Sequence, residues 1–460
     1  MSLAENCLGD AALLTAKGHF QTPATIVEHM VAKLFEDRAP KSSDTLLDAG
    51  CGAGDFIEGI ILWCQKHKNP LPRIIGVELD PKLGSIARNR FREYPEVRVE
   101  ERDFLATCDG EYEFIISNPP YVSILQLSEE EKRLYKPLYE TARSRFDLYL
   151  LFFEKALKIL KKDGRLVFIT PEKYTYVETS RPLRRIMAGM QVREIEFLKE
   201  NAFSGLTTYP TITIVENSPP LRETEVSYRN GTTQKATLPK NGERWLPTLN
   251  GSVNICMNHK LKDICIRISC GVATGSDEIF IKRTDTLDSY LEAFAYPTIS
   301  GRELRYEDEK LPSLYSILVP YDEQGELIPF EKLGDFGKYL SQPHIAARLK
   351  QRSCCRKKPW YAFHENPPMK DLLCSKILCK DIAARPYFWL DGDGLFIPRH
   401  SVYYIVPKHV SRIRDLLEYL RSDLARDWLA KNSQRAANNF IRLQSSALKE
   451  LPIPERLYSS

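Results

Sequence analysis

Short apolar runs alternate with amphipathic stretches through residues 1–217. Runs rich in Leu, Ile and Val, such as those beginning at Thr45 and Arg73, have the length and composition of buried strands. Strands that alternate with helices favour a parallel sheet with helices on both faces. The pattern therefore predicts an α/β fold with a doubly wound, mostly parallel sheet. One helix is expected to begin at Pro23, with Thr22 as its capping residue.

The pattern changes in the proline-containing segment Asn217–Leu221, which we interpret as a domain boundary. A chain of 460 residues is long enough for more than one domain. Residues 218–460 carry short β-like runs between turns and a stretch of helical periodicity at 412–429, which predicts an α+β domain. The segment Asp391–Gly394 (Asp-Gly-Asp-Gly) separates two of these runs and predicts a hairpin turn.

The segment Asn118-Pro119-Pro120-Tyr121 follows a short apolar, β-branched run that contains Ile115 and Ile116. It should therefore lie at the carboxyl end of a strand, where open α/β sheets bind ligands. Its two prolines fix φ and remove two backbone donors, but they keep their carbonyl acceptors. Such a stiff loop, with acceptors and an aromatic ring, suits a flat substrate that bears an exocyclic amino group. A proline-stiffened turn with a core tyrosine is the alternative.

An earlier predicted strand runs into three alternating glycines, Gly50, Gly52 and Gly54. Glycines at a strand-to-helix turn allow a tight bend and close approach of the backbone to a ligand. Asp48 and Asp55 flank these glycines. Their charges disfavour a dianionic phosphate and favour a cofactor with an ammonium group, so a dinucleotide-dependent oxidoreductase is not expected.

Two further strand ends carry acids. Glu78 ends the second predicted strand and lies close to the spacing of about 20 residues expected for a ribose-binding acid. Asp103 and Phe104 follow the third predicted strand. A glycine loop, two acids and the Asn-Pro-Pro-Tyr loop thus follow four successive strands, and their order indicates one ligand-binding edge.

In these segments the chain resembles the class I, S-adenosylmethionine-dependent amino-methyltransferases. It most resembles the gamma-class N6-adenine DNA methyltransferases of type II restriction–modification systems. The likeness begins at the segment 18–23 (Gly-His-Phe-Gln-Thr-Pro) and becomes diffuse after residue 217. It implies S-adenosyl-L-methionine as cofactor, bound by Phe20, Thr22, Asp48, Gly50, Gly52, Glu78, Asp103, Phe104 and Asn118. It also implies a catalytic set of Asn118, Pro119, Pro120, Tyr121 and Phe203.

The resemblance implies a specific chemistry for the catalytic loop. The Asn118 side-chain oxygen and the Pro119 carbonyl would accept the hydrogens of the target amino group and turn its lone pair out of conjugation. Tyr121 would stack on one face of a flipped-out adenine and Phe203 on the other. Tyr209 is a rival for the role of Phe203, because the sequence departs from the family pattern there. In residues 218–460 the likeness to target-recognition domains rests on a glycine-containing loop and the closing Leu-Pro-Ile-Pro.

Other functions use related chemistry. Methylation of cytosine, of a ribosomal RNA base or of a protein glutamine amide would present a similar amino group. The cytosine class more often has Ser at the position of Asn118, and the glutamine enzymes lack a large domain after the catalytic half. A DNA-binding protein without turnover is the non-enzymatic alternative, although it would be expected to lose residues such as Asp48 or Glu78.

The two halves of the chain differ in their balance of basic and acidic side chains. Residues 1–220 carry 29 Lys and Arg against 32 Asp and Glu, whereas residues 221–460 carry 36 against 29. Residues 338–460 are the most basic, with 22 cationic side chains against 11 anionic ones. This asymmetry favours a surface for double-stranded DNA in the second half.

The remaining features point to a cytoplasmic protein. No apolar run approaches the roughly 18 residues of a membrane span, and no secretion signal is evident at the amino terminus. The 11 cysteines are therefore expected to be reduced. Cys354, Cys355, His364, Cys374 and Cys379 lack the paired spacing of zinc knuckles, so no metal site is predicted. We expect a monomer, with any cognate restriction endonuclease on a separate chain.

Overall fold

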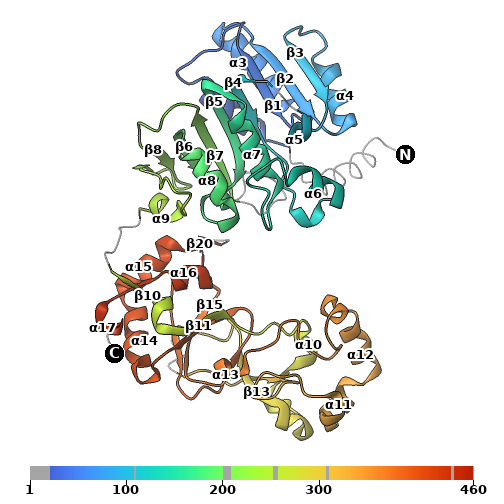
Figure 1. The fold of residues 1–460 in the computed structure, drawn as a ribbon, viewed down its shortest axis with the longest axis vertical. Helices are drawn as coiled ribbons and strands as arrows, with labels where there is room; N and C mark the ends of the chain where they lie inside the picture. The colour runs from blue at the N-terminus through green and yellow to red at the C-terminus, as the bar shows by residue number, and fades with distance from the viewer. Residues whose placement is uncertain are drawn as a thin grey trace. The chain divides into compact units, whose positions relative to one another are not determined.

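The structure is a computed structural model, and it describes residues 21–107, 110–199, 209–251, 257–306, 310–436 and 440–458. The chain forms two compact units, Met1–Gly251 and Ser252–Ser460 (Figure 1). Each unit has its own sheets and its own hydrophobic cores.

The first unit is built on one nine-stranded sheet with the order β3-β2-β1-β4-β5-β7-β6-β8-β9 (Figure 1). Its strands are β1 (Thr45–Ala49), β2 (Arg73–Glu78), β3 (Val97–Glu101), β4 (Tyr112–Ser117), β5 (Leu160–Pro171), β6 (Gln191–Phe197), β7 (Pro210–Glu216), β8 (Thr224–Ser227) and β9 (Thr233–Ala236). The pairs among β3, β2, β1, β4 and β5 are all parallel, whereas β7 runs antiparallel to both β5 and β6. The predicted doubly wound, mostly parallel sheet is confirmed.

Helices cover both faces of this sheet because the strands are apolar on both sides. Successive strand residues point to opposite faces, so Leu166 and Phe168 of β5 join one core while Val167 and Ile169 join the other. The helices of this unit are α2 (Ala24–Phe35), α3 (Asp55–His67), α4 (Pro81–Arg90), α5 (Phe104–Thr107), α6 (Glu129–Tyr135), α7 (Leu148–Lys158), α8 (Arg181–Met187) and α9 (Leu246–Leu249). Helices α2 and α3 pack in one core, and α5, α7 and α8 in the other.

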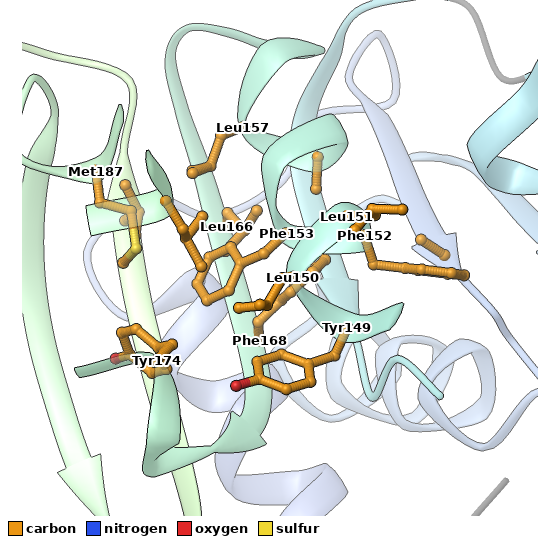
Figure 2. Close-up of a cluster of buried hydrophobic side chains, with 14 of the residues drawn as sticks. Tyr149, Leu150, Leu151, Phe152, Phe153, Leu157, Leu166, Phe168, Tyr174 and Met187 are labelled. Carbon is orange, nitrogen blue, oxygen red and sulfur yellow. The ribbon is translucent and has the colours of Figure 1, made fainter. Parts of the chain in front are cut away.

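Helix α7 is the centre of the second of these cores. Its residues from Leu148 to Phe153 are all buried, which fits a helix enclosed on most of its surface. Figure 2 shows Phe153 lying against Leu166 and Phe168 of β5, and the Phe153 and Phe168 ring centroids are 5.0 Å apart. This packing fixes β5, and through its parallel pairing with β4 it fixes the strand that carries the Asn-Pro-Pro-Tyr loop.

The first unit extends beyond the boundary expected at residue 217. Strand β8 pairs with β6, and β9 pairs with β8, so both complete the central sheet. Trp245 is fully buried in the same core as α7, and its ring lies edge-on to Tyr174. Residues 218–251 therefore pack with the first unit, because their apolar side chains and strand edges are satisfied there. The proline segment that suggested the boundary is a connection between two strands of the same sheet.

Replacement of Trp245 by alanine is expected to destabilise the first unit. The indole is 0% exposed, so its removal leaves a cavity, and a loss of about 3 kcal/mol in unfolding free energy is expected. Chemical denaturation monitored by circular dichroism measures this loss. Leu221→Ala is the matched control, because Leu221 is 86% exposed and should change stability by less than about 0.5 kcal/mol. An equal effect of the two substitutions would contradict the burial of Trp245.

The second unit combines small sheets with short helices, as the predicted α+β domain requires. Its sheets have the orders β10-β22, β11-β19-β15-β17, β12-β14-β13-β18 and β16-β21-β20. The strands are β10 (His259–Lys260), β11 (Cys265–Cys270), β12 (Ile281–Arg283), β13 (Ala295–Ile299), β14 (Tyr315–Leu318), β15 (Lys376–Lys380), β16 (Ile382–Ala383), β17 (Trp389–Asp391), β18 (Ile397–Pro398), β19 (Val402–Pro407), β20 (Gln434–Arg435), β21 (Ile441–Arg442) and β22 (Pro452–Ile453). The helices are α10 (Asp277–Phe280), α11 (Gly334–Leu340), α12 (Pro343–Lys350), α13 (Met369–Leu372), α14 (Ile413–Arg421), α15 (Asp423–Asn432), α16 (Ser445–Lys449) and α17 (Glu455–Tyr458).

The hairpin predicted at Asp391–Gly394 is not formed. Strand β17, which ends at Asp391, pairs with β15, while β18 after the turn pairs with β13 of another sheet. The reason is the buried carboxylate of Asp391, which accepts a hydrogen bond from Lys376 Nζ at 2.5 Å and another from the backbone N–H of Phe396 at 3.0 Å. These bonds hold the turn against β15 rather than closing a local strand pair.

Candidate active site at the carboxyl ends of the central strands

The glycine loop lies where the strand order of the sheet reverses. Strand β1 is flanked by β2 and by β4, and such a switch point is where doubly wound sheets bind ligands. Gly52 and Gly54 have φ of 56° and 91°, a backbone conformation that favours glycine. A Cβ at Gly54 would also overlap the ring of Phe91. The loop is tied to the end of β2, since the Gly50 N–H donates to the Val77 carbonyl at 2.8 Å.

Asp48 carries a buried carboxylate without a partner among the described residues. It lies on β1 and is 0% exposed, and neither of its oxygens accepts a hydrogen bond there. Burial, together with the nearby charges of Glu78 and Asp55, raises the pKa of Asp48 well above its ordinary value. A buried acceptor that is left unpaired is costly. The site therefore has a place for a cationic donor.

Glu78 braces the glycine loop. Its Oε2 accepts the Gly52 N–H at 2.8 Å, and its Oε1 accepts the Asp80 N–H at 2.8 Å. Asp80 in turn caps α4 by accepting the Lys82 N–H at 2.9 Å. The carboxylate predicted to bind ribose is thus held against the loop, and each of its oxygens has lone pairs for a further donor.

Asp103 and Phe104 follow the end of β3, where α5 begins, but they differ in environment. Asp103 Oδ1 accepts the Leu105 N–H at 2.8 Å, and Oδ2 accepts the Tyr135 hydroxyl at 2.9 Å. The Phe104 ring is 3% exposed and packs against Phe152, with centroids 5.0 Å apart. The aromatic ring at this strand end therefore belongs to the core, and the more accessible group is the carboxylate of Asp103.

Asn118 joins the catalytic loop to the amino-terminal segment. Its Nδ2 donates to the hydroxyl of Thr22 at 3.1 Å, a contact between residues 96 positions apart. The predicted capping role of Thr22 is wrong, because α2 begins at Ala24 with Pro23 as its N-cap and without a side-chain capping bond. The structure thus brings together two residues that the sequence assigned to the same site.

Strands β1 and β4 pair in parallel, and their register sets where the glycine loop and the catalytic loop begin. Asp48 is paired in register with Ile116, and the Ser117 hydroxyl donates to the carbonyl of Ala49. The residues that follow these two strands, Gly50 and Asn118, therefore leave the sheet at the same level. In this way the cofactor loop and the catalytic loop begin side by side.

Tyr121 is held on two sides. Its hydroxyl donates to the Ile169 carbonyl at 3.1 Å, and its ring lies edge-on to Tyr149 at a centroid distance of 6.2 Å. Burial raises the pKa of the Tyr121 hydroxyl above its ordinary value. Pro119 is buried and Pro120 is half-buried. The loop is thus rigid, with an aromatic ring that is fixed before any substrate arrives.

Two predicted residues, Phe20 and Phe203, lie outside the described residues. Tyr209, the rival of Phe203, is half-buried, and its ring lies 5.1 Å below the Arg229 guanidinium. Its carbonyl accepts the Glu172 N–H at 2.9 Å. Tyr209 is therefore anchored to the framework of the sheet.

Arg229 is a residue at this site that sequence reasoning missed. Its Nε donates to the Leu198 carbonyl at 3.0 Å, and its guanidinium forms an ion pair with Glu172, which is 3% exposed. Leu198 and Tyr209 are the residues on either side of the stretch 199–208, so Arg229 contacts both ends of the segment that contains Phe203. No local pattern signals this role, because the two bonds span 31 and 57 positions.

Arg229→Met is expected to destabilise the chain, because the buried Glu172 carboxylate would lose its ionic partner. The expected loss is about 2 kcal/mol, below the usual range for fully buried pairs because Arg229 is 27% exposed. Urea denaturation measures it. The double variant Arg229→Met/Glu172→Gln should recover most of the loss, since no unpaired charge remains. A double variant as unstable as the sum of both single variants would contradict the ion pair.

The chain is similar in sequence to a family of methylases and to individual methyltransferases. Residues 64–203 match the family described as Eco57I restriction-modification methylase. The chain is 24% identical to the type II methyltransferase M.PaeR7I of Pseudomonas aeruginosa, over 96% of this chain and 86% of that protein. It is 22% identical to M.BstVI of Geobacillus stearothermophilus, over 96% and 92% of the two chains. The chain is related to type II restriction–modification methyltransferases.

A solved structure supports the fold over both units. The type IIL restriction–modification enzyme MmeI, determined in complex with DNA, has a TM-score of 0.64 and 14% sequence identity, covering 94% of this chain and 67% of that one. The first unit has the class I methyltransferase fold. This fold and the methylase family match imply S-adenosylmethionine as the cofactor, and the unpaired carboxylate of Asp48 fits its ammonium group.

Two further features are absent from the described ranges. Within them, no group of three or more His, Cys, Asp or Glu side chains is placed to hold a metal ion. No helix in the same ranges is both long and apolar enough to cross a membrane.

Proposed function

We infer that the chain transfers a methyl group to the N6 amino group of a flipped-out adenine in double-stranded DNA. The observation that carries this proposal is the alignment of the Asn118–Tyr121 loop with the glycine loop at the switch point of the sheet. The relatives named type II methyltransferases support DNA as the substrate. The adenine specificity is inferred from the Asn-Pro-Pro-Tyr loop itself.

The residues of the first unit fit the cofactor at separate points. The Asp48 carboxylate would accept hydrogen bonds from the ammonium group, and Glu78 would accept from the ribose hydroxyls. Asp103 would accept from the adenine amino group. Thr22, which accepts from Asn118, would contact the cofactor beside the catalytic loop. Phe20 is included as a cofactor-binding residue on the family resemblance alone. When bound, S-adenosylmethionine supplies the electrophilic methyl group of its sulfonium.

The catalytic loop would act by positioning and by electrostatics. Asn118 donates Nδ2 to the Thr22 hydroxyl, and its Oδ1 would accept an amino hydrogen of the base. The Pro119 carbonyl would accept the second hydrogen. Together they stabilise the positive charge that develops on the nitrogen. Tyr121 and Phe203 would hold the two faces of the base, and flipping costs a few kcal/mol that binding must offset.

The second unit would bind the target duplex and read its sequence. Its excess of basic side chains supports phosphate contacts. The chain would act as a monomer, and protection against a cognate endonuclease on a separate chain would be its biological role.

Expression in a bacterial host that lacks DNA methylation, followed by single-molecule sequencing, tests the proposed function. N6-methyladenine confined to one short motif is the expected result. Methylated cytosine would correct the base. Unmodified DNA from cells that contain folded, cofactor-binding protein would point to an RNA base or a glutamine amide, or to a silent binding role, and would refute the proposal.

A further inference from the structure

A cleft in the second unit has a volume of about 1040 Å³. Its walls come mainly from four segments: the turn 300–305 after β13, Leu314–Tyr315 at the start of β14, Asp381–Ile382 after β15, and 399–401 before β19. Asp277 of α10 and Pro312 complete the lining. We call these four segments the recognition cleft. They come from more than one sheet, so only the fold of the second unit brings them together.

The backbone of the recognition cleft is rigid. The Gly301 N–H donates to the Ser401 hydroxyl at 3.0 Å, and a Cβ at Gly301 would lie 3.1 Å from the Ser401 carbonyl oxygen. Leu304 is 1% exposed and anchors the turn in the core. The indole N–H of Trp389 donates to the Arg305 carbonyl at 2.9 Å. The side chains on this turn therefore stand on a fixed base, which reduces the entropy lost when they bind a ligand.

The acids of the cleft are used within the protein. Glu303 forms an ion pair with Arg399 and accepts the Ser300 hydroxyl at 2.8 Å. Asp381 accepts from Arg442 at 3.1 Å. The hydroxyl of Thr274 donates to Asp277 at 2.5 Å. Glu303 and Asp381 are thus paired with arginines, whereas Asp277 accepts from a neutral hydroxyl.

Two arginines of the same turn have no such partner. Arg302 and Arg305 are exposed on either side of the buried Leu304. Their backbones are hydrogen-bonded within the protein, but neither guanidinium forms a hydrogen bond or an ion pair with any of the described residues. Beside them, Leu314 is 56% exposed and Ile382 is 47% exposed. The cleft thus offers two guanidinium groups that have no ionic partner among the described residues, next to apolar side chains.

Guanidinium groups next to apolar side chains are suited to contact the edges of base pairs. An arginine fork donates to the O6 and N7 atoms of guanine, the commonest base-specific contact, and apolar side chains contact the methyl group of thymine. Two exposed cations suit an extended polyanion better than an enclosed small anion. We propose that the recognition cleft reads the target sequence, with Arg302 and Arg305 contacting base edges and the Arg399–Glu303 pair holding the turn. This proposal rests on the proposed function.

Arg302→Ala and Arg305→Ala, made separately in the full chain, test the proposal. At least one of them is expected to relax one position of the methylated motif, with discrimination at that base pair falling by about 10- to 100-fold. Single-molecule sequencing of DNA from expressing cells measures the motif, and purified enzyme on matched duplexes measures the discrimination. Arg414→Ala is the matched control, because Arg414 is exposed on α14 and does not line the cleft.

The other outcomes separate the two proposals. If the wild-type chain methylates no DNA, the proposed function fails and the inference fails with it. If it methylates a motif and both cleft variants keep that motif with the kinetics of Arg414→Ala, the inference alone is refuted. Weaker binding to all duplexes, with a salt dependence smaller by about one ion and an unchanged motif, would indicate a phosphate contact and would also refute base reading. Thermal unfolding and cofactor binding equal to wild type confirm that the variants are folded.

Discussion

Asn118→Ala is expected to lower the rate of methyl transfer by at least about 10³-fold while cofactor affinity changes by less than about threefold. The variant removes the side-chain oxygen that would accept an amino hydrogen of the target base. The transition state would then lose an acceptor at the point where positive charge develops. Single-turnover assays with labelled cofactor measure the rate, and calorimetry measures the affinity.

The contact between Asn118 and Thr22 provides a matched control. Thr22→Val removes the hydroxyl that accepts from Asn118 Nδ2 but preserves the shape of the side chain. Loss of one hydrogen bond of about 1 kcal/mol corresponds to a rate reduction of roughly tenfold or less, because Asn118 would still be present but less firmly oriented. If Asn118→Ala lost cofactor affinity and rate to the same extent, Asn118 would belong to the cofactor site rather than to the catalytic group.

Asp48→Asn is expected to have opposite effects on cofactor binding and on the stability of the cofactor-free protein. The variant removes the buried negative charge that would pair with the cofactor ammonium, and a loss of affinity of about 10²–10³-fold is expected. Without cofactor, however, the carboxylate is buried and has no partner among the described residues. Its removal should increase the unfolding free energy by about 1–3 kcal/mol.

The pH dependence of stability tests the same residue. Burial raises the pKa of Asp48 above the value of 3.8 expected for an exposed aspartate. The folded state therefore holds the proton more tightly than the unfolded state, so the stabilisation is complete below the unfolded pKa and is lost as pH rises through the folded pKa. Relative to Asp48→Asn, the cofactor-free wild-type protein should lose stability from about pH 4 upward. Saturating cofactor should suppress this loss.

Asp55→Asn is the control for Asp48. It removes a charge next to the same glycine loop, but Asp55 already has a partner in Arg90 at 3.2 Å. Its cofactor affinity should remain within about threefold of wild type, since Asp55 is not an unpaired buried acceptor. Equal losses of affinity in the two variants would show that overall negative charge, rather than the Asp48 carboxylate, attracts the cofactor.

The sequence by itself determined the architecture of the first unit and the chemistry at its strand ends. Residues in short apolar runs can only be satisfied inside a sheet, and the residues that follow parallel strands must meet at one edge. The order of the glycine loop, Glu78, Asp103 and Asn118 therefore predicted one ligand-binding edge, and the family resemblance added Asp48 to it. Their residue types also limited the chemistry, because acids and acceptors suit an ammonium group and an exocyclic amine.

Only the tertiary structure decided how distant segments cooperate. The contact of Thr22 with Asn118, the ion pair of Arg229 with Glu172 and the extension of the first unit to Gly251 depend on contacts between residues far apart in the chain. The turn at Asp391 illustrates the same limit, since its local hairpin signal was overridden by a buried lysine at position 376. Hydrophobic periodicity describes which side of an element is buried, but not which element covers it. For that reason the recognition cleft, which is assembled from four separate segments, is visible only in the folded chain.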